Sequence, residues 1–271
     1  MNRVPRVVTL LSDFGLRDEY AGVMEAVIVR IAPDARVVHL THGIEPQGVL
    51  QGALALAHAL PYAPAGVHLA VVDPGVGSER RAVVVATGDG RLLVGPDNGL
   101  LTFAADDLGG ITAAYAIENG GLFLQPVSRT FHGRDVFAPV AAHLAAGLAP
   151  SEVGPEIDPD TLVRIELPPA HLEEGHVRAA AMAIDRFGNV ALSVRGAELD
   201  RLGLSTGARI EISAGAGRYF ALRARTFADV RVGEMVVFDD SSGWAALAMN
   251  SGSIIDICDI ERGDVIDLRL R

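Results

Sequence analysis

Polar side chains able to do chemistry gather in three short segments of the first half of the chain. They are Ser12-Asp13, the loop from Asp73 to Arg81, and the stretch from Thr130 to Asp135. Each follows an apolar, strand-like run or precedes a helix-like one. Ligands of parallel α/β sheets bind outside the carboxyl ends of the strands, so these segments are the first candidates for a site.

The loop Asp73-Pro74-Gly75-Val76-Gly77-Ser78-Glu79-Arg80-Arg81 places a carboxylate close to a guanidinium. Its two glycines permit close backbone approach, and the Asp73 carboxylate can face an arginine across the loop. Because arginine stays charged, such a pair can hold a water and favour its deprotonated form. An ordinary loop salt bridge has the same pattern, and both interpretations stay open on the spacing alone.

Asp13 and His132 each allow a structural and a functional interpretation. The Asp13 carboxylate, at a strand end, can accept two hydrogen bonds and suits a ribose diol, or it can cap a helix or form an Asx turn. His132 precedes an expected helix start, and Gly133 leaves space beside its ring. It can act as a base or cap that helix.

Several other chemistries are disfavoured. No G-x-G-x-x-G follows the first strand, which argues against a dinucleotide cofactor, and no G-x-S-x-G elbow supports Ser-His-Asp catalysis. All 23 basic residues are arginine, which excludes a lysine Schiff base and a P-loop lysine. His39 and His42 form an H-x-x-H pattern, but residues three apart on a strand point to opposite faces. We therefore expect no metal site there, and no cofactor.

In the second half, the loop Asp185-Arg186-Phe187-Gly188-Asn189 lies between two strand-like runs. Gly-Asn suits a hairpin turn. The functional alternative is a ligand clamp: the Asp185 carboxylate for an ammonium, the Asn189 amide for a carboxylate or a base edge, and Phe187 as an aromatic plate. The polar loop at Ser242, followed by an apolar strand through Ala248, is by itself only a turn pattern of a β domain.

The elements that must position these residues alternate in the first half of the chain. A strand-like run at 7–11 precedes a helical pattern with apolar residues at 20, 23, 24, 27, 28 and 31. A second strand-like run at 36–40, a second helical pattern after Pro46 and a third strand-like run at 67–72 follow. Runs at 81–87 and 91–94 flank Gly88-Asp89-Gly90 and predict a hairpin. A last helix should begin near Gly133. This order predicts an N-terminal α/β domain with a mostly parallel central sheet flanked by helices.

The composition changes in a proline-rich, acidic stretch before Gly175, after which short β-rich runs dominate. We expect an N-terminal α/β domain over residues 1–165, a linker over 166–175 and a smaller β-barrel-like domain over 176–271.

Composition narrows the classes of partner. Among 271 residues, 34 acidic and 23 basic side chains give a formal charge of −11, which argues against binding a nucleic-acid backbone. The single Cys258 cannot form an intramolecular disulfide or a multi-cysteine metal site. Neither a signal peptide nor an 18-residue apolar run is present, so we expect a cytoplasmic protein without membrane contact.

Seven segments, taken in order, resemble the S-adenosyl-L-methionine hydroxide adenosyltransferase family. The resemblance covers nearly the whole chain, and the motifs at 71–81, 95–99 and 131–135 are specific when they occur together. The segments are SDFG (12–15), THGIEP (41–46), VVDPGVGSERR (71–81), GPDNGLL (95–101), TFHGRDVFAPVAAHLA (130–145), IDRFGNV (184–190) and AALAMNSG (245–252).

The resemblance implies a homotrimer with active sites between the N-terminal domain of one subunit and the C-terminal domain of its neighbour. The implied reaction is attack of a water-derived hydroxide at ribose C5′ of S-adenosylmethionine, which yields adenosine and L-methionine without metal or redox cofactor. By motif position Asp73, Arg80 and His132 match the family's catalytic triad, and Asp13 matches the residue that holds the ribose hydroxyls. The expected contacts to methionine and adenine are Asp185, Phe187, Asn189, Ser242 and Ala248.

Two alternatives remain from the sequence. The halogenating relatives carry tyrosine at the position of His132 and an extra loop for which the run between Asn98 and Ile111 has no room, although chlorinating members share Gly133. A non-catalytic module that binds S-adenosylmethionine or adenosine is the second alternative, but binding alone would not need the three triad side chains.

Overall fold

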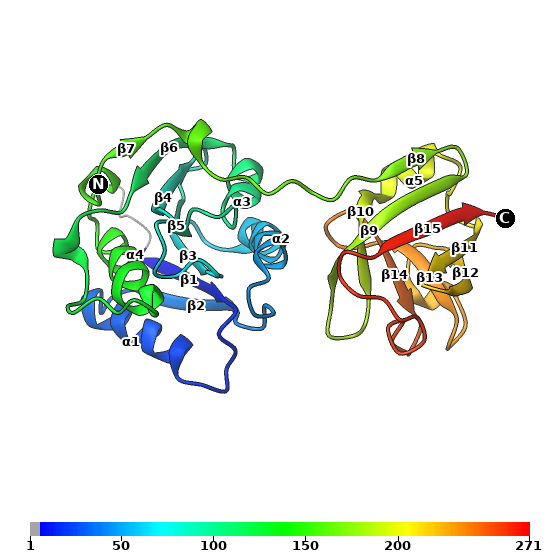
Figure 1. Cartoon of the computed structure of the whole chain (residues 1–271), viewed down its shortest axis with the longest axis horizontal. Helices are drawn as coiled ribbons and strands as arrows, with labels where there is room; N and C mark the ends of the chain where they lie inside the picture. The colour runs from blue at the N-terminus through cyan, green and yellow to red at the C-terminus, as the bar shows by residue number, and fades with distance from the viewer. Residues whose placement is uncertain (1–5) are drawn as a thin grey trace. The chain divides into compact units, whose positions relative to one another are not determined.

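The computed structural model describes residues 6–271, and the chain divides into two compact units after Ile165 (Figure 1). Within these residues no helix has both the length and the apolar character needed to cross a bilayer.

The first unit alternates strands and helices, which confirms the expected α/β class. Its elements are β1 (Val7–Ser12), α1 (Tyr20–Ile31), β2 (Arg36–Thr41), α2 (Val49–Ala59), η1 (Leu60–Tyr62), β3 (Val67–Val71), β4 (Ala82–Thr87), β5 (Leu92–Pro96), α3 (Thr102–Asp107), β6 (Ile111–Ala116), η2 (Gly120–Leu122), η3 (Gly133–Phe137), α4 (Ala138–Ala145), η4 (Pro150–Glu152), β7 (Glu156–Ile157) and η5 (Pro159–Thr161).

The sheet of this unit has the strand order β2-β1-β3-β5-β4-β6-β7. Strands β2, β1, β3 and β5 are parallel, whereas β4, β6 and β7 pair antiparallel with their neighbours. The change of direction arises at the hairpin between β4 and β5, where the Gly90 amide donates to the Thr87 carbonyl. The parallel half therefore carries β1 and β3, the strands that the candidate residues Asp13 and Asp73 follow.

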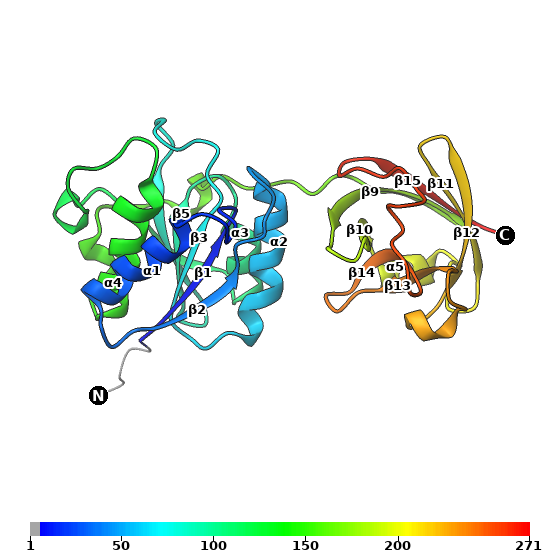
Figure 2. The same ribbon diagram turned by 90° about the horizontal axis from the view of Figure 1, so that it is seen from below.

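Helices cover both faces of this sheet, α1 and α4 on one and α2 and α3 on the other (Figure 2). Helix α1 buries Ala21, Met24, Val27 and Ile28, which recur at the spacing of one helix face. Together with β1, β3 and α4 they form one apolar core, and α2 and α3 form a second core on the opposite face. The sheet is thus covered on both sides, as parallel strands require.

The second unit, Glu166–Arg271, is a closed barrel. The ring runs β10-β14-β13-β12-β11-β15-β9, and the pairing of β9 with β10 closes it, while β8 pairs with the first residues of β9. Its elements are β8 (His171–Glu173), β9 (His176–Ile184), β10 (Val190–Arg195), α5 (Gly196–Arg201), β11 (Arg209–Ala214), β12 (Gly217–Arg223), η6 (Phe227–Asp229), β13 (Met235–Asp239), β14 (Trp244–Met249) and β15 (Val265–Leu270).

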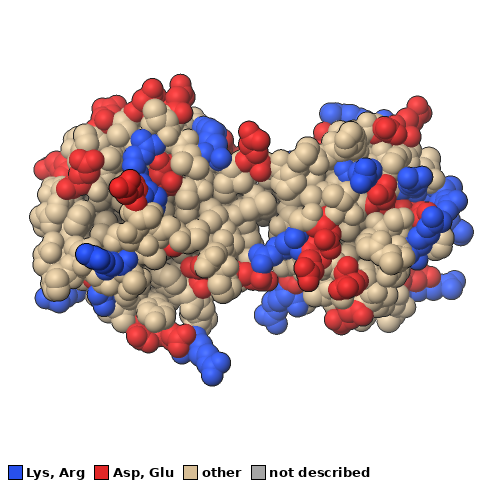
Figure 3. All heavy atoms as spheres, in the orientation of Figure 1, with Lys and Arg blue, Asp and Glu red and all other residues tan. Residues whose placement is uncertain are grey.

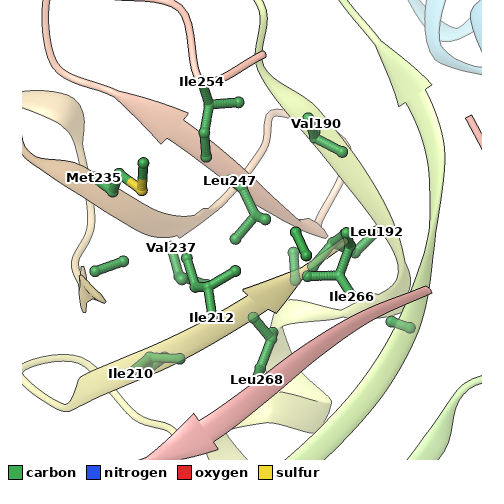
Figure 4. Packing of buried hydrophobic residues seen from close by; sticks show 14 of the residues in the cluster. Val190, Leu192, Ile210, Ile212, Met235, Val237, Leu247, Ile254, Ile266 and Leu268 are labelled. Carbon is green, nitrogen blue, oxygen red and sulfur yellow. The ribbon is translucent and has the colours of Figure 1, made fainter. Parts of the chain in front are cut away.

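Aliphatic side chains from all around the ring fill the barrel. Leu192, Ile212, Val237, Leu247 and Leu268 come from five different strands and meet in its interior (Figure 4). The expected β-barrel-like domain is confirmed. Strand β8 lies inside residues 166–175, the expected linker, and it is bound to β9 by register pairs such as Leu172 with Val177.

Acidic and basic side chains are interspersed over the face drawn in Figure 3, where the described residues form no continuous basic stripe.

Candidate active site

Asp73, Arg80 and His132 lie together in the first unit. The Arg80 Nε atom donates to both Asp73 carboxylate oxygens, at 3.0 and 3.1 Å, and Arg80 Nη2 also contacts Asp73 Oδ2. Arg80 Nη2 lies 3.0 Å from Nδ1 of His132. The loop after β3 and the segment before η3, far apart in sequence, are therefore joined through one guanidinium.

This guanidinium has little freedom to move. Its side chain is 12% exposed and that of Asp73 is 5% exposed, and the Arg80 Cζ atom lies 5.2 Å from the centre of the Phe137 ring. A buried charge is stable only when it is paired and hydrogen-bonded, and Asp73 provides both. The arrangement fixes a positive charge beside His132.

The ring of His132 is held in its neutral form. Burial lowers the pKa of His132, the nearby charge of Arg80 lowers it further, and Asp73 and Asp135 only partly oppose the shift. Arg80 can only donate, so Nδ1 of His132 must accept, and the neutral ring carries its proton on Nε2. The remaining nitrogen of His132 is therefore a hydrogen-bond donor.

Two local features shape the loop from Asp73 to Arg80 and the segment around His132. Gly77 has φ of +77°, and a Cβ built there would lie 2.5 Å from the Arg129 carbonyl oxygen, so only glycine lets the Asp73–Arg80 loop approach the segment before His132. On the other side, the buried Asp135 carboxylate accepts from the Ser128 amide at 2.8 Å. It also receives two bonds from Arg134, at 2.7 and 2.9 Å.

Asp13 lies after β1, beside the same group. Its Oδ2 atom accepts from the backbone amide of Gln47 at 2.9 Å. Gln47 has φ of +65°, which is uncommon for a residue with a side chain and aims its N–H at the carboxylate. Asp13 is thus oriented by the loop that follows β2.

A small pocket joins these groups. It has a volume of about 150 Å³ and is lined by Asp13, Asp73 and His132 together with Phe14, Val71, Val76, Thr130, Phe131 and Gly133. Phe14 and Phe131 meet edge to face at 5.7 Å between ring centres, and Tyr20 lies 5.2 Å from Phe131. Sites for drug-sized ligands occupy about 300–1,000 Å³, so this pocket takes only part of a nucleoside-sized molecule.

The expectation that His39 and His42 point to opposite faces is wrong. Nδ1 of His39 lies 2.7 Å from Nε2 of His42, because β2 ends at Thr41 and His42 lies in the bend beyond it, where strand alternation no longer applies. The two nitrogens face each other in a hydrogen bond. Among the described residues no group of three or more His, Cys, Asp or Glu side chains converges as metal ligands do.

In the second unit the Asp185–Asn189 loop is a closed turn after β9. Asp185 accepts from the amides of Phe187 and Asn189, at 2.8 and 3.0 Å, and from Nδ2 of Asn189 at 2.8 Å. The Phe187 ring is 63% exposed. The turn therefore holds three of the expected binding residues side by side.

Ser242 and Ala248 differ in their surroundings. Ser242 lies in the turn before β14, where its amide donates to Asp240 and its carbonyl accepts from Arg195. Ala248 is fully buried, in a small cluster with Val236 and Phe238. Their contacts with a ligand stay predictions.

Sequence reasoning missed two contributors to the site. Asp135 has no role of its own among the expectations from the sequence, although an acid in the first turn of a helix next to a histidine is a recognisable signal. The aromatic cluster of Phe14, Tyr20 and Phe131 has no such signal, because it unites two segments more than 100 residues apart.

Comparison with known proteins places both units in one family. Residues 8–154 match the model of the SAM hydroxide adenosyltransferase N-terminal domain, and residues 179–267 match that of the C-terminal domain. A protein of Salinispora tropica named (R)-S-adenosyl-L-methionine hydrolase is 46% identical, with 95% of each chain covered. A protein of the same name from Thermus thermophilus is 42% identical, covering 95% of this chain and 97% of the relative.

A more distant relative is a fluorinase of Actinopolyspora mzabensis, 29% identical over 92% of each chain. Among solved structures, an uncharacterised conserved protein of Thermotoga maritima superposes with a TM-score of 0.89 at 35% identity. That match covers 97% of this chain and 99% of the other.

Proposed function

The chain belongs to the SAM hydroxide adenosyltransferase family, and from this premise we propose that it hydrolyses S-adenosyl-L-methionine to adenosine and L-methionine. The observation that carries the proposal is the Arg80 guanidinium, fixed by Asp73 and bonded to His132 at the edge of the pocket that also contains Asp13.

The reaction needs little from the protein beyond an oriented nucleophile. A sulfonium leaves readily, so no acid is needed to protonate it. A water-derived oxygen forms a bond to ribose C5′ as the C5′–S bond breaks. The electron pair of the C5′–S bond stays with the sulfur. One proton is released, which balances the loss of the positive sulfonium. The enzyme's task is to hold the oxygen in line with the C5′–S bond and to limit competing water.

We assign Arg80 and His132 to the nucleophile. The fixed charge of Arg80 favours the deprotonated water, and the Nε2–H of His132 donates to its oxygen and sets its direction. With Nδ1 accepting from Arg80, His132 serves as a donor to the hydroxide, and the proton that the water has lost passes to solvent. Asp73 keeps the guanidinium in place.

We assign the substrate's remaining groups to residues of both units. Asp13, oriented by the Gln47 amide, takes the ribose hydroxyls. Asp185, Phe187 and Asn189 contact methionine and adenine, with Ser242 and Ala248 completing that part of the pocket. The small volume beside His132 favours a site to which a second subunit contributes. We propose a cytoplasmic homotrimer with active sites at its subunit interfaces, and no metal or cofactor.

The test is incubation of purified protein with S-adenosylmethionine, with and without chloride, and chromatography of the products. Adenosine and methionine in equal amounts, independent of chloride, are expected. A 5′-chloro-5′-deoxyadenosine product would move the chain to the halogenating relatives. Intact S-adenosylmethionine recovered in complex with the protein would instead indicate a binding module.

A further inference from the structure

A continuous hydrogen-bonded chain of side chains runs from the end of β1 to the surface of α1, outside the residues assigned above. Buried Ser12 Oγ lies 2.7 Å from Nδ1 of His42. Nε2 of His42 lies 2.7 Å from Nδ1 of His39, and Nε2 of His39 lies 3.2 Å from a carboxylate oxygen of Glu25. Ser12 immediately precedes Asp13.

The acid at the outer end sets the direction of every bond in this chain. An ionised Glu25 only accepts, so His39 donates to it from Nε2 and accepts at Nδ1. His42 then donates from Nε2 and accepts at Nδ1, which leaves the Ser12 hydroxyl as the donor at the inner end. The oxygen of Ser12 remains open to the amide of Phe14, which lies 3.3 Å away.

The ring of His42 stays neutral in this arrangement. Burial lowers the pKa of His42, and His39 lowers it further, against a smaller raising effect of Glu25. A neutral His42 has one donor and one acceptor, and the chain uses both. The bond between Ser12 and His42 is therefore a fixed tie between the loops after β1 and β2.

Other contacts tie the same two loops at Asp13. The His42 carbonyl accepts from the Gly15 amide at 2.8 Å, and Asp13 accepts from the Gln47 amide at 2.9 Å. His42 thus holds the residues on either side of Asp13, one through its ring and one through its carbonyl.

We propose that His42 and Ser12 are positioning residues that fix the Asp13 carboxylate for the ribose hydroxyls of the substrate. The inference rests on the proposed function, since that function gives Asp13 its ligand. Ser12 is fully buried and does not line the pocket, so its effect passes through the backbone of the Ser12–Gly15 loop.

The same strand supplies a matched control. Thr9 Oγ1 lies 2.9 Å from Nδ1 of His68, again a buried hydroxyl bonded to a buried histidine, and both residues are fully buried. Burial lowers the pKa of His68 to about 4, so this ring is neutral as well. The pair joins β1 to β3 three residues before Ser12 and does not line the pocket.

The experiment compares Ser12→Ala with Thr9→Val, each of which removes one buried hydroxyl. Ser12→Ala should raise KM for S-adenosylmethionine about tenfold and leave kcat within about twofold, as expected for loosening a hydrogen bond that acts on binding. Thr9→Val should leave both constants within about twofold. Thermal unfolding of the two variants should shift by similar amounts, since each loses one buried hydrogen bond.

A second pair tests the ring itself. His42→Leu should raise KM as Ser12→Ala does, and His42→Asn, whose Oδ1 can accept from the Ser12 hydroxyl near the Nδ1 position, should restore most of the loss. His68→Leu and His68→Asn should differ in stability and not in KM. A purely structural role would make the two histidines equivalent in every measurement.

Calorimetric binding of adenosine separates this inference from the proposed function, because it needs no turnover. Adenosine binding without hydrolysis of S-adenosylmethionine would overturn the proposed function alone, and the Kd values of Ser12→Ala and Thr9→Val would still test the positioning role. Equal Kd and KM values for these two variants would overturn the inference. If His42→Leu does not fold, the comparison of Ser12→Ala with Thr9→Val and the result for His42→Asn still test the positioning role.

Discussion

At the scale of single residues, the account depends on which nitrogen of His132 carries the proton. Arg80 occupies Nδ1, so the neutral ring offers a donor at Nε2 and no acceptor to a water in the pocket. This assignment could not come from the sequence, where His132 allows the roles of base and cap alike. It follows from one contact between residues 52 positions apart.

Replacement of His132 by asparagine tests the roles of the two ring nitrogens separately. His132→Asn keeps an acceptor for Arg80 near the place of Nδ1 and removes the donor at Nε2. We expect kcat to fall by about two to three orders of magnitude, as for the loss of one oriented donor, with nearly unchanged Kd for S-adenosylmethionine. Steady-state kinetics and calorimetry measure the two effects. Arg164→Gln, which breaks an exposed pair with Asp106, is the control and should behave as wild type.

The pH dependence of the reaction should reflect His132 as well. Its pKa is lowered below the ordinary value of 6.5 by burial and by Arg80, so the neutral ring persists into mildly acidic solution. We expect kcat/KM to be level from neutral pH down to 6.5 and to fall only below it, where a proton on Nδ1 would face the N–H of Arg80. The stability that the neutral ring contributes is lost in the same acidic window. A midpoint above 6.5 would contradict the assignment.

At the scale of elements, the site exists because the loops after β1 and β3 meet the segment before η3. At Gly77 the backbones of two of them approach each other closely. Gly77→Ala forces an L residue into φ of +77° and presses its Cβ on the Arg129 carbonyl. We expect a loss of turnover of tenfold or more, since Arg80 and His132 are held by these two loops.

Gly90→Ala provides the control for backbone strain. Gly90 has φ of +87° in the β4–β5 turn, and a Cβ there would meet nothing within 4 Å. The Gly90→Ala substitution should lower the free energy of unfolding by about 1 kcal/mol, because alanine disfavours the left-handed conformation, and it should leave kcat unchanged. Thermal unfolding and kinetics on both variants make the comparison. Equal activity of the two would show that the approach at Gly77 does not matter for the site.

Strong apolar periodicity explains which elements the sequence predicts. Helix α1 repeats its buried residues on one face, and β3 is an unbroken apolar run, so both are recognisable without tertiary information. Strand β6, with the sequence ITAAYA, is rich in alanine, which has no preference for strands, and it forms because β4 pairs with it. The contact of His39 with His42 escaped prediction because it depends on where β2 ends.

Of the contacts within the candidate site, one was also predictable from the sequence and another was not. Asp73 and Arg80 lie in one loop, and their pairing was foreseeable from that loop. The contact of Arg80 with His132 followed only from the family resemblance, because the residues between them form β4, β5, α3 and β6.

At the scale of the whole molecule, the proposal requires more than one copy of the chain. Light scattering should give close to three times 28.4 kDa. The Asp73–Arg80–His132 group and the Asp185–Asn189 turn would then act together from different subunits. A fully active monomer would contradict this arrangement.

Mixed assemblies test the sharing of sites. Asp73→Asn removes a charge beside Arg80, and Asp185→Ala removes the acceptor that organises its turn, so each variant alone should be nearly inactive. Co-expression of the two variants should recover part of the activity. Some subunit interfaces then combine an intact Asp73 from one subunit with an intact Asp185 from its neighbour. No recovery in assemblies verified to contain both variants would show that each site belongs to a single chain.

The most direct test of the central claim is the fate of the water oxygen. A single-turnover reaction with S-adenosylmethionine, run in water labelled with heavy oxygen and containing chloride, is analysed by mass spectrometry. Attack at C5′ by the nucleophile held at Arg80 and His132 predicts one labelled oxygen in the 5′-hydroxyl of adenosine and none in methionine. Unlabelled adenosine, a chlorinated nucleoside, or unreacted S-adenosylmethionine would contradict it.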